Sequence, residues 1–209
     1  MTEKKRYEIL KSLPAYGPMY ISISKNGKQF YSEGFVIRFY KDDGTDWVAN
    51  FETGWSGLDK VFDCSEKNTI VVFAGGFGYV MNPNEEKPLI TIDSMVNEVF
   101  QTQNGDLICI DDIGIQIFNI LTREIWTSER ISWDGFKDLT FEDGIIKGKS
   151  FDPTNSIKEW TDFSFNTENK EIKGGSFREM LKQNPHLEMK NRVEVKLKTK
   201  EKKPWWKIW

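Results

Sequence analysis

Apolar residues along this chain occur in short runs of four to six, separated by turns rich in glycine, asparagine and aspartate. Examples are the runs at 35–39, 70–73 and 107–110. Runs of this length, bounded by turn residues, are typical of β-strands and not of helices. The pattern therefore predicts a chain made mainly of short strands.

Three segments of the chain align with one another. They begin at Trp55, Asp93 and Trp133, which lie 38 and 40 residues apart, and each has an apolar residue at its fourth and seventh places and a charged residue at its sixth. Each unit later reaches an asparagine that starts a polar turn; these are Asn82, Asn119 and Asn166. A unit of about 38 residues with three or four strands approaches the ~40–45 residues of a propeller blade.

We therefore predict an all-β fold, a small β-propeller-like antiparallel meander of about four repeat units. The units cover about 20–54, 55–92, 93–132 and 133–175, and they form a β-repeat domain over 20–175. An N-terminal segment at 1–19 precedes this domain, and a helix, a strand and a basic tail at 176–209 follow it. The last unit contains an insertion around 151–157. A β-sandwich is the alternative, because strand spacing alone also permits it. A closed ring and an open meander fit equally well.

Helical signals are few. Ser176 and Glu179 form the pattern of a capping box, and Pro185 would end the helix that follows. A short helix is also expected around 3–11, before Pro14. At 193–199, apolar and charged residues alternate, which predicts a half-buried strand.

Composition is that of a folded chain of 209 residues, with 38% hydrophobic and 14% aromatic residues. No apolar run reaches the ~18 residues of a membrane span, and the N-terminus does not have the pattern of a secretory signal. The two cysteines, Cys64 and Cys109, lie in strand-like contexts and are expected to be buried free thiols. Together these features predict a cytoplasmic protein.

Charge is distributed unevenly. Residues 190–209 contain eight Lys/Arg and two acidic residues, which leaves 21 basic and 30 acidic residues in 1–189. An acidic body with a basic tail is the main electrostatic feature of the chain.

Catalytic patterns are sparse. His186 is the single histidine, and the glycine-rich stretch 74–79 lacks the Gly-Lys-Ser/Thr of a phosphate-binding loop. No paired Cys or His has metal-ligand spacing, so we expect no catalytic residue, metal or cofactor. A carbohydrate-active hydrolase that uses carboxylates is the alternative. The adjacent Asp111 and Asp112 would point to opposite faces of a strand and are poor candidates.

The tail carries the candidate binding residues. Three of the eight tryptophans fall in the last five residues, beside lysines. They would dock on the body, anchor the chain at a membrane surface, or fill a groove on a protein partner. The candidate partner-binding residues are Trp205, Trp206, Lys207, Trp209 and, in the insertion of the last unit, an exposed Trp160. Nucleic acid is not expected, because the acidic body would repel phosphate.

The segment 132–139, with 151–153, 159–164 and the pair Gly174-Gly175, resembles small uncharacterised bacterial β-repeat proteins over about 54–176. The ending from Lys203 to Trp209 resembles C-terminal tails of small bacterial proteins, some with an immunity-like role. The resemblance implies an accessory binding protein and no characterised activity. We therefore predict a non-enzymatic protein that engages a protein partner, of unknown oligomeric state. The alternatives are the hydrolase and a tail-anchored peripheral membrane protein.

Overall fold

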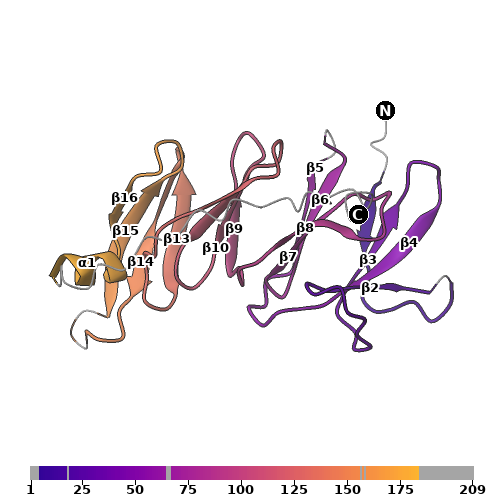
Figure 1. The fold of residues 1–209 in the computed structure, drawn as a ribbon, viewed down its shortest axis with the longest axis horizontal. Coiled ribbons are helices and arrows are strands. Elements are labelled where there is room, and N and C mark those ends of the chain that lie inside the picture. Colours follow the sequence, from indigo (N-terminus) through magenta and orange to yellow (C-terminus); the bar gives the residue numbers. More distant parts are fainter. Residues whose placement is uncertain (1–4, 18, 65–66, 156, 158, 184–209) are drawn as a thin grey trace, which may run out of the picture.

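The computed structural model describes residues 5–17, 19–64, 67–155, 157 and 159–183. It contains four four-stranded sheets and one helix (Figure 1). The first sheet consists of β1 (Tyr7–Ile9), β2 (Ile21–Ile23), β3 (Phe35–Tyr40) and β4 (Asp46–Phe51). The second consists of β5 (Lys60–Cys64), β6 (Thr69–Ala74), β7 (Phe77–Met81) and β8 (Pro88–Ile92). The third consists of β9 (Glu98–Gln101), β10 (Leu107–Ile110), β11 (Ile115–Phe118) and β12 (Ile125–Thr127). The fourth consists of β13 (Phe136–Glu142), β14 (Ile145–Phe151), β15 (Trp160–Asn166) and β16 (Ile172–Gly174), and helix α1 (Ser176–Gln183) follows it.

The predicted fold class is confirmed. The second, third and fourth sheets are antiparallel meanders whose strands follow one another in chain order. The first sheet has the order β1-β3-β4-β2, and β2 pairs with β4 in parallel. It therefore reproduces the shape of a repeat unit with a different path of the chain.

The segment 1–19 contributes to the first sheet. Tyr7 pairs with Phe39, and Ile9 pairs with Ile37. The helix expected around 3–11 was wrong, because Tyr7 packs against the apolar cluster between the first two sheets. Side-chain burial on a sheet overrides weak local helix propensity there. The unit boundaries at 55, 93 and 133 fall in the linkers between sheets.

The four sheets stand in a row and form an open array. Three apolar clusters join the first sheet to the second, the second to the third, and the third to the fourth. Within the described residues no such cluster joins the fourth sheet to the first, and these two lie at opposite ends of the array in Figure 1. The choice between a closed ring and an open meander is thereby settled in favour of the open one.

The register explains why the fourth sheet can end the array. Across it, Ile146 pairs with both Phe141 and Phe165, and this row faces the third sheet. The alternate row of Lys147, Ser164 and Lys173 is on the opposite, outer face. A terminal repeat needs a polar outer face to remain soluble, and these side chains provide it.

The turns repeat as well as the strands. The side-chain oxygens of Asn119 and Asn166 each accept hydrogen bonds from backbone N–H groups two and three residues ahead, and Asn82 accepts one from the N–H of Asn84. These Asx turns reverse the chain between the third and fourth strands of three sheets. The asparagines recognised in the sequence are therefore structural.

Helix α1 was predicted correctly, but its first residue acts differently from a capping box. The Ser176 hydroxyl donates to the carbonyl oxygen of Phe151 at 2.6 Å, so it ties the helix start to the fourth sheet. The N–H of Glu179 donates to the carbonyl of Gly175 at 2.9 Å. Pro185 and the strand expected at 193–199 lie outside the described residues.

Candidate partner-binding site

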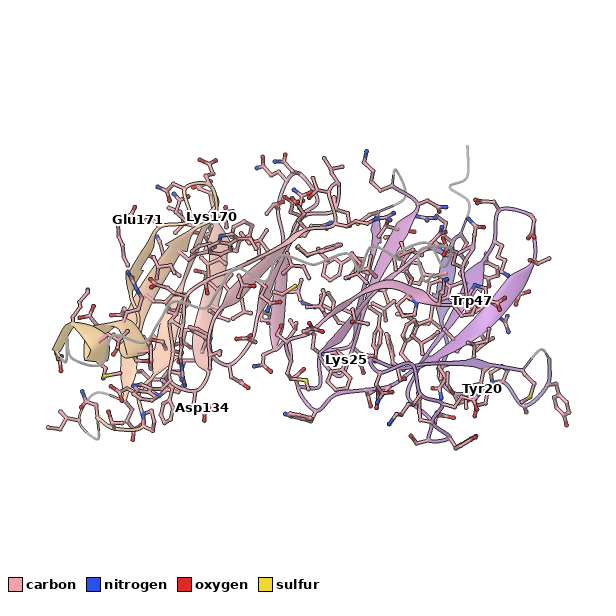
Figure 2. All side chains as sticks on the ribbon, in the orientation of Figure 1. Tyr20, Lys25, Trp47, Asp134, Lys170 and Glu171 are labelled. Carbon is pink, nitrogen blue, oxygen red and sulfur yellow. The ribbon has the colours of Figure 1, made fainter. Side chains whose placement is uncertain are left out.

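The linkers between sheets and the β6–β7, β10–β11 and β14–β15 hairpins all lie along one edge of the row of sheets. We call this edge the linker end. It is the lower edge in Figures 1 and 2, where Lys25 and Asp134 are labelled, whereas Lys170 and Glu171 mark the opposite edge. Three large apolar side chains in segments of this end are almost fully exposed: Tyr31 at 83%, Trp55 at 83% and Ile157 at 97%. Exposed apolar residues indicate an interaction surface where they form a contiguous patch with neighbouring side chains.

Trp55 projects from a linker whose main chain is firmly held. The N–H of Gly54 donates to the carbonyl of Ala74 at 3.0 Å, and the N–H of Ser56 donates to that of Gly75 at 3.1 Å. The Ser56 hydroxyl donates to the carbonyl of Val96 at 2.7 Å. These bonds fix the backbone on both sides of Trp55 and leave its indole in solvent.

The indole stands beside a second aromatic ring and a lysine. The ring of Phe77, at the start of β7, lies 6.4 Å from it in an edge-to-face arrangement. The Nζ of Lys25 lies 4.6 Å from the centre of the Phe77 ring and donates to the carbonyl oxygen of Asp93 at 2.9 Å. Four separate segments of the chain therefore meet around Trp55.

Acidic groups border this cluster. Partial burial lowers the pKa of Lys25, and the negative charges of Asp93 and Glu52 oppose that shift. The Glu52 carboxylate also accepts the backbone N–H of Lys25 at 3.3 Å. We call this set of Lys25, Glu52, Trp55, Phe77 and Asp93 the Trp55 surface. It has two carboxylates, one ammonium group and two aromatic rings.

Trp133 has the same place in the last unit as Trp55 has in the second. The N–H of Trp133 donates to the carbonyl at the end of β14, and in the second unit the N–H of Gly54, one residue before Trp55, donates to the carbonyl at the end of β6. Two residues beyond each tryptophan, Gly57 and Gly135 have positive φ values of 74° and 96°. The repeat therefore places both tryptophans in equivalent linkers.

The surroundings of the two tryptophans differ. The ring of Phe177, from α1, lies 4.9 Å from the Trp133 ring, edge to face. The guanidinium carbon of Arg130 lies 5.1 Å from the centre of the Trp133 ring and 4.6 Å from that of Phe177. Trp133 thus has an aromatic and a cationic partner from its own chain, while Trp55 remains 83% exposed.

Trp160, expected to be exposed in the insertion, is half-buried as the first residue of β15. Its ring lies 5.1 Å from that of Phe151, and the Nζ of Lys137 lies 4.0 Å from its centre. The adjoining outer face of the fourth sheet holds a shallow depression of about 500 Å³. Its lining includes Lys147, Lys149, Lys173, Asp138 and Asp162. Its charges are of both signs, with three lysines and two aspartates, as expected of a solvated end face.

The remaining candidates have structural positions or are not described. Trp205, Trp206, Lys207, Trp209 and His186 lie outside the described residues. Asp111 and Asp112 occupy the β10–β11 turn, where Asp111 accepts the N–H groups of Ile113 and Gly114 and Asp112 accepts the side chain of Asn97. The glycine-rich stretch 74–79 contains the β6–β7 hairpin turn, as expected.

Other groups of chemical interest in the described part of the chain are the potential metal ligands and the two cysteines. No cluster of three or more His, Cys, Asp or Glu there is placed to hold a metal ion. Cys64 and Cys109 are free thiols, and burial raises the pKa of both. No helix in the described part is long and apolar enough to cross a membrane.

The sequence alone assigned Trp55 to the repeat architecture and did not identify it as a binding residue. One signal was available. Three residues before each tryptophan the chain has Glu52 in one unit and Arg130 in the other, and among the described residues only the last unit is followed by a helix. Glu52 and Arg130 occupy the same repeat position with opposite charges, which indicates that the two tryptophans have different neighbouring groups.

The four stacked four-stranded sheets, three of them antiparallel meanders, define the class of protein, a β-propeller-like repeat protein. No family model and no curated protein matches the chain. Among solved structures it is similar to the computationally designed Ika4 protein, with 16% identity over 59% of this chain and 76% of that one and a TM-score of 0.39. The computationally designed Ika8 protein shows 16% identity over 71% and 48%, with a TM-score of 0.39. The WD40 domain of Neurospora crassa Pan2 shows 10% identity over 70% and 50%, with a TM-score of 0.39. The chain spans about half the length of the last two, and these likenesses carry no argument about function.

Proposed function

We propose that the chain is a non-enzymatic binding protein that engages a protein partner through the Trp55 surface. The observation that carries the proposal is the 83% exposure of Trp55 on a backbone held rigidly by Gly54 and Ser56. Tryptophan is among the residues most enriched at the energetic centres of protein interfaces. A pre-organised site also loses little conformational entropy when a partner binds.

Neighbouring groups favour a protein ligand. Phe77 widens the apolar contact beside Trp55, while Glu52 and Asp93 supply acceptors for hydrogen bonds and ion pairs at its border. An apolar centre with a polar rim is the usual anatomy of a protein interface. The partner side chains that best fit are aromatic and basic. A toxin-neutralising immunity role is one concrete form of this function, in keeping with the resemblance of the tail.

The test is capture of partners from cells of the source organism with three full-length baits: wild type, Trp55→Ala and Leu121→Ala. Leu121 is 61% exposed in the β11–β12 turn, on the edge of the row of sheets opposite the linker end. It serves as the matched control. We expect a protein that is retained by wild type and Leu121→Ala and depleted at least tenfold with Trp55→Ala. Equal retention by all three baits, with Trp55→Ala still folded by circular dichroism, would overturn the proposal.

A further inference from the structure

The comparison of Trp133 with Trp55 shows what the Trp55 surface lacks. In the last unit, Phe177 covers the edge of the indole and Arg130 lies against both rings. In the second unit Trp55 has Phe77 at 6.4 Å but no cation against its ring among the described residues, and the place of Arg130 is taken by Glu52. A ligand that supplied an aromatic ring together with a positive charge would complete this unit in the same way as the last one.

The chain itself contains a segment of this chemistry. Residues 200–209, outside the described part, include four lysines and the tryptophans Trp205, Trp206 and Trp209. Lysine suits the border formed by Glu52 and Asp93, and an indole suits the exposed ring of Trp55. Aromatic pairs gain about 0.5–1.5 kcal/mol beyond the burial of their surface.

We propose that the Trp55 surface binds segment 200–209 of its own chain, with an indole of that segment against Trp55 and a lysine beside Glu52. This inference rests on the proposed function for the choice of surface. It adds that the chain's own tail and the partner compete for that surface.

The tail is long enough for this contact. Helix α1 ends at Gln183 beside the fourth sheet, and 26 residues follow it. Extended chain spans at most ~3.3 Å per residue, so the tail reaches roughly 85 Å. Stacked sheets lie ~10 Å apart, so the linker before the second sheet is about 20–30 Å along the array. A tether of this length gives an effective concentration in the millimolar range, which suffices for a weak contact.

The competing site on the chain is less suitable. The outer face of the fourth sheet is nearer to Gln183, but its depression is lined by three lysines and two aspartates. A segment with a surplus of lysines would be repelled there. Charge complementarity therefore selects the Trp55 surface.

The test labels the full-length chain with 5-fluorotryptophan and follows the fluorine resonances, with Trp55 assigned by Trp55→Phe. The tail variant replaces Trp205, Trp206 and Trp209 by alanine in the full chain. We expect the Trp55 resonance to differ between wild type and the tail variant, and that of Trp160 to stay unchanged. Identical Trp55 resonances would overturn the inference.

A second measurement adds a fluorescent peptide of residues 200–209 to the tail variant and records anisotropy. We expect saturable binding that weakens at least tenfold with Trp55→Ala, weakens with Glu52→Lys, and is unaffected by Leu121→Ala. Equal binding to all of these variants would count against the proposal. The wild-type Trp55 resonance should not change between about 10 and 500 μM protein, since a concentration-dependent change would place the tail on a second copy and refute the same-chain contact.

The two proposals fail separately. If Trp55→Ala loses the captured partner while the tail leaves the Trp55 resonance unchanged, the proposed function stands and the tail contact is refuted. If the tail binds but no partner depends on Trp55, the tail contact stands and the proposed function is refuted.

Discussion

The rings of Trp133 and Phe177 meet edge to face with their centres 4.9 Å apart, and this contact joins helix α1 to the last repeat. Phe177 is 4% exposed, so it buries nearly its whole side chain. An isolated helix of eight residues is not stable in water. The contact therefore helps to hold α1 in its helical form.

Replacing Phe177 by alanine removes this anchor. We expect Phe177→Ala to lower the free energy of unfolding by about 3 kcal/mol, since it deletes a buried aromatic side chain. The measurement is urea unfolding followed by circular dichroism. Leu121→Ala, at an exposed site, should change the same quantity by less than ~0.5 kcal/mol. A Phe177→Ala effect as small as that of the control would contradict the assigned role of the contact.

Trp133 itself allows a finer test. Its indole Nε1 is buried and has no hydrogen-bond partner among the described residues. Trp133→Phe keeps the ring against Phe177 and removes the unsatisfied donor, so we expect it to cost less than about 1 kcal/mol, whereas Trp133→Ala should cost about 2–3 kcal/mol. Thermal unfolding of the two variants measures this difference, and equal losses of stability would contradict the assigned packing of the Trp133 ring against Phe177.

The equivalent change at Trp55 should behave differently. Because Trp55 is 83% exposed, Trp55→Ala should lower the free energy of unfolding by less than ~1 kcal/mol, including the small loss expected when the tail no longer binds its surface. Trp133→Ala is the matched control, at the same repeat position. If both variants lost 2–3 kcal/mol, Trp55 would be a structural residue and the candidate site would lose its basis.

Much of this architecture could be predicted from the sequence. The asparagine turns and the linker glycines Gly57 and Gly135 follow from local backbone requirements that each unit meets independently. The strand at Tyr7–Ile9 could not be predicted, because its formation depends on pairing with β3, about thirty residues later. The same applies to the parallel pairing of β2 with β4, which no periodicity encodes.

The candidate site could not be predicted from the sequence for a related reason. Trp55 and Trp133 are the same residue at the same repeat position, and only their neighbours in space differ. Among the described residues, Phe177 belongs to a helix that follows only the last unit. Its contact with Trp133 is a tertiary contact, which the repeat pattern does not encode. The sequence contains the difference between Glu52 and Arg130, but its meaning depends on seeing Arg130 against two rings.

Substitutions at two glycines with the same φ angle distinguish the cost of backbone strain from the cost of steric collision. Gly44 and Gly76 both have a φ of +89°. A Cβ at Gly44 would meet nothing within 4 Å, whereas one at Gly76 would lie 2.2 Å from the Ser56 hydroxyl oxygen and 2.5 Å from the carbonyl oxygen of Val96. We expect Gly44→Ala to cost about 1–2 kcal/mol, from strain alone, and Gly76→Ala at least ~3 kcal/mol.

Urea unfolding of both variants supplies the comparison. The difference between them measures how tightly the Ser56 linker is held over the β6–β7 hairpin. Gly76→Ala should also disturb the Trp55 surface, which depends on that linker. Similar losses from the two substitutions would mean that the linker moves freely away from the hairpin.

Burial raises the pKa of the Cys109 thiol far above its ordinary value of 9.0, and the neighbouring Asp111 raises it further. The unfolded chain therefore releases this proton near pH 9 while the folded chain retains it. Since the folded state then binds more protons, its stability is fully present below pH 8 and falls as the pH rises past 9.

We expect a loss of about 1.4 kcal/mol from Cys109 between pH 8 and pH 10. Cys109→Ala should be less stable at pH 7 but show a correspondingly flatter decline over the same interval, measured by urea unfolding at each pH. Parallel declines in wild type and Cys109→Ala would contradict the assignment of this pH dependence to the Cys109 thiol, which is buried in strand β10.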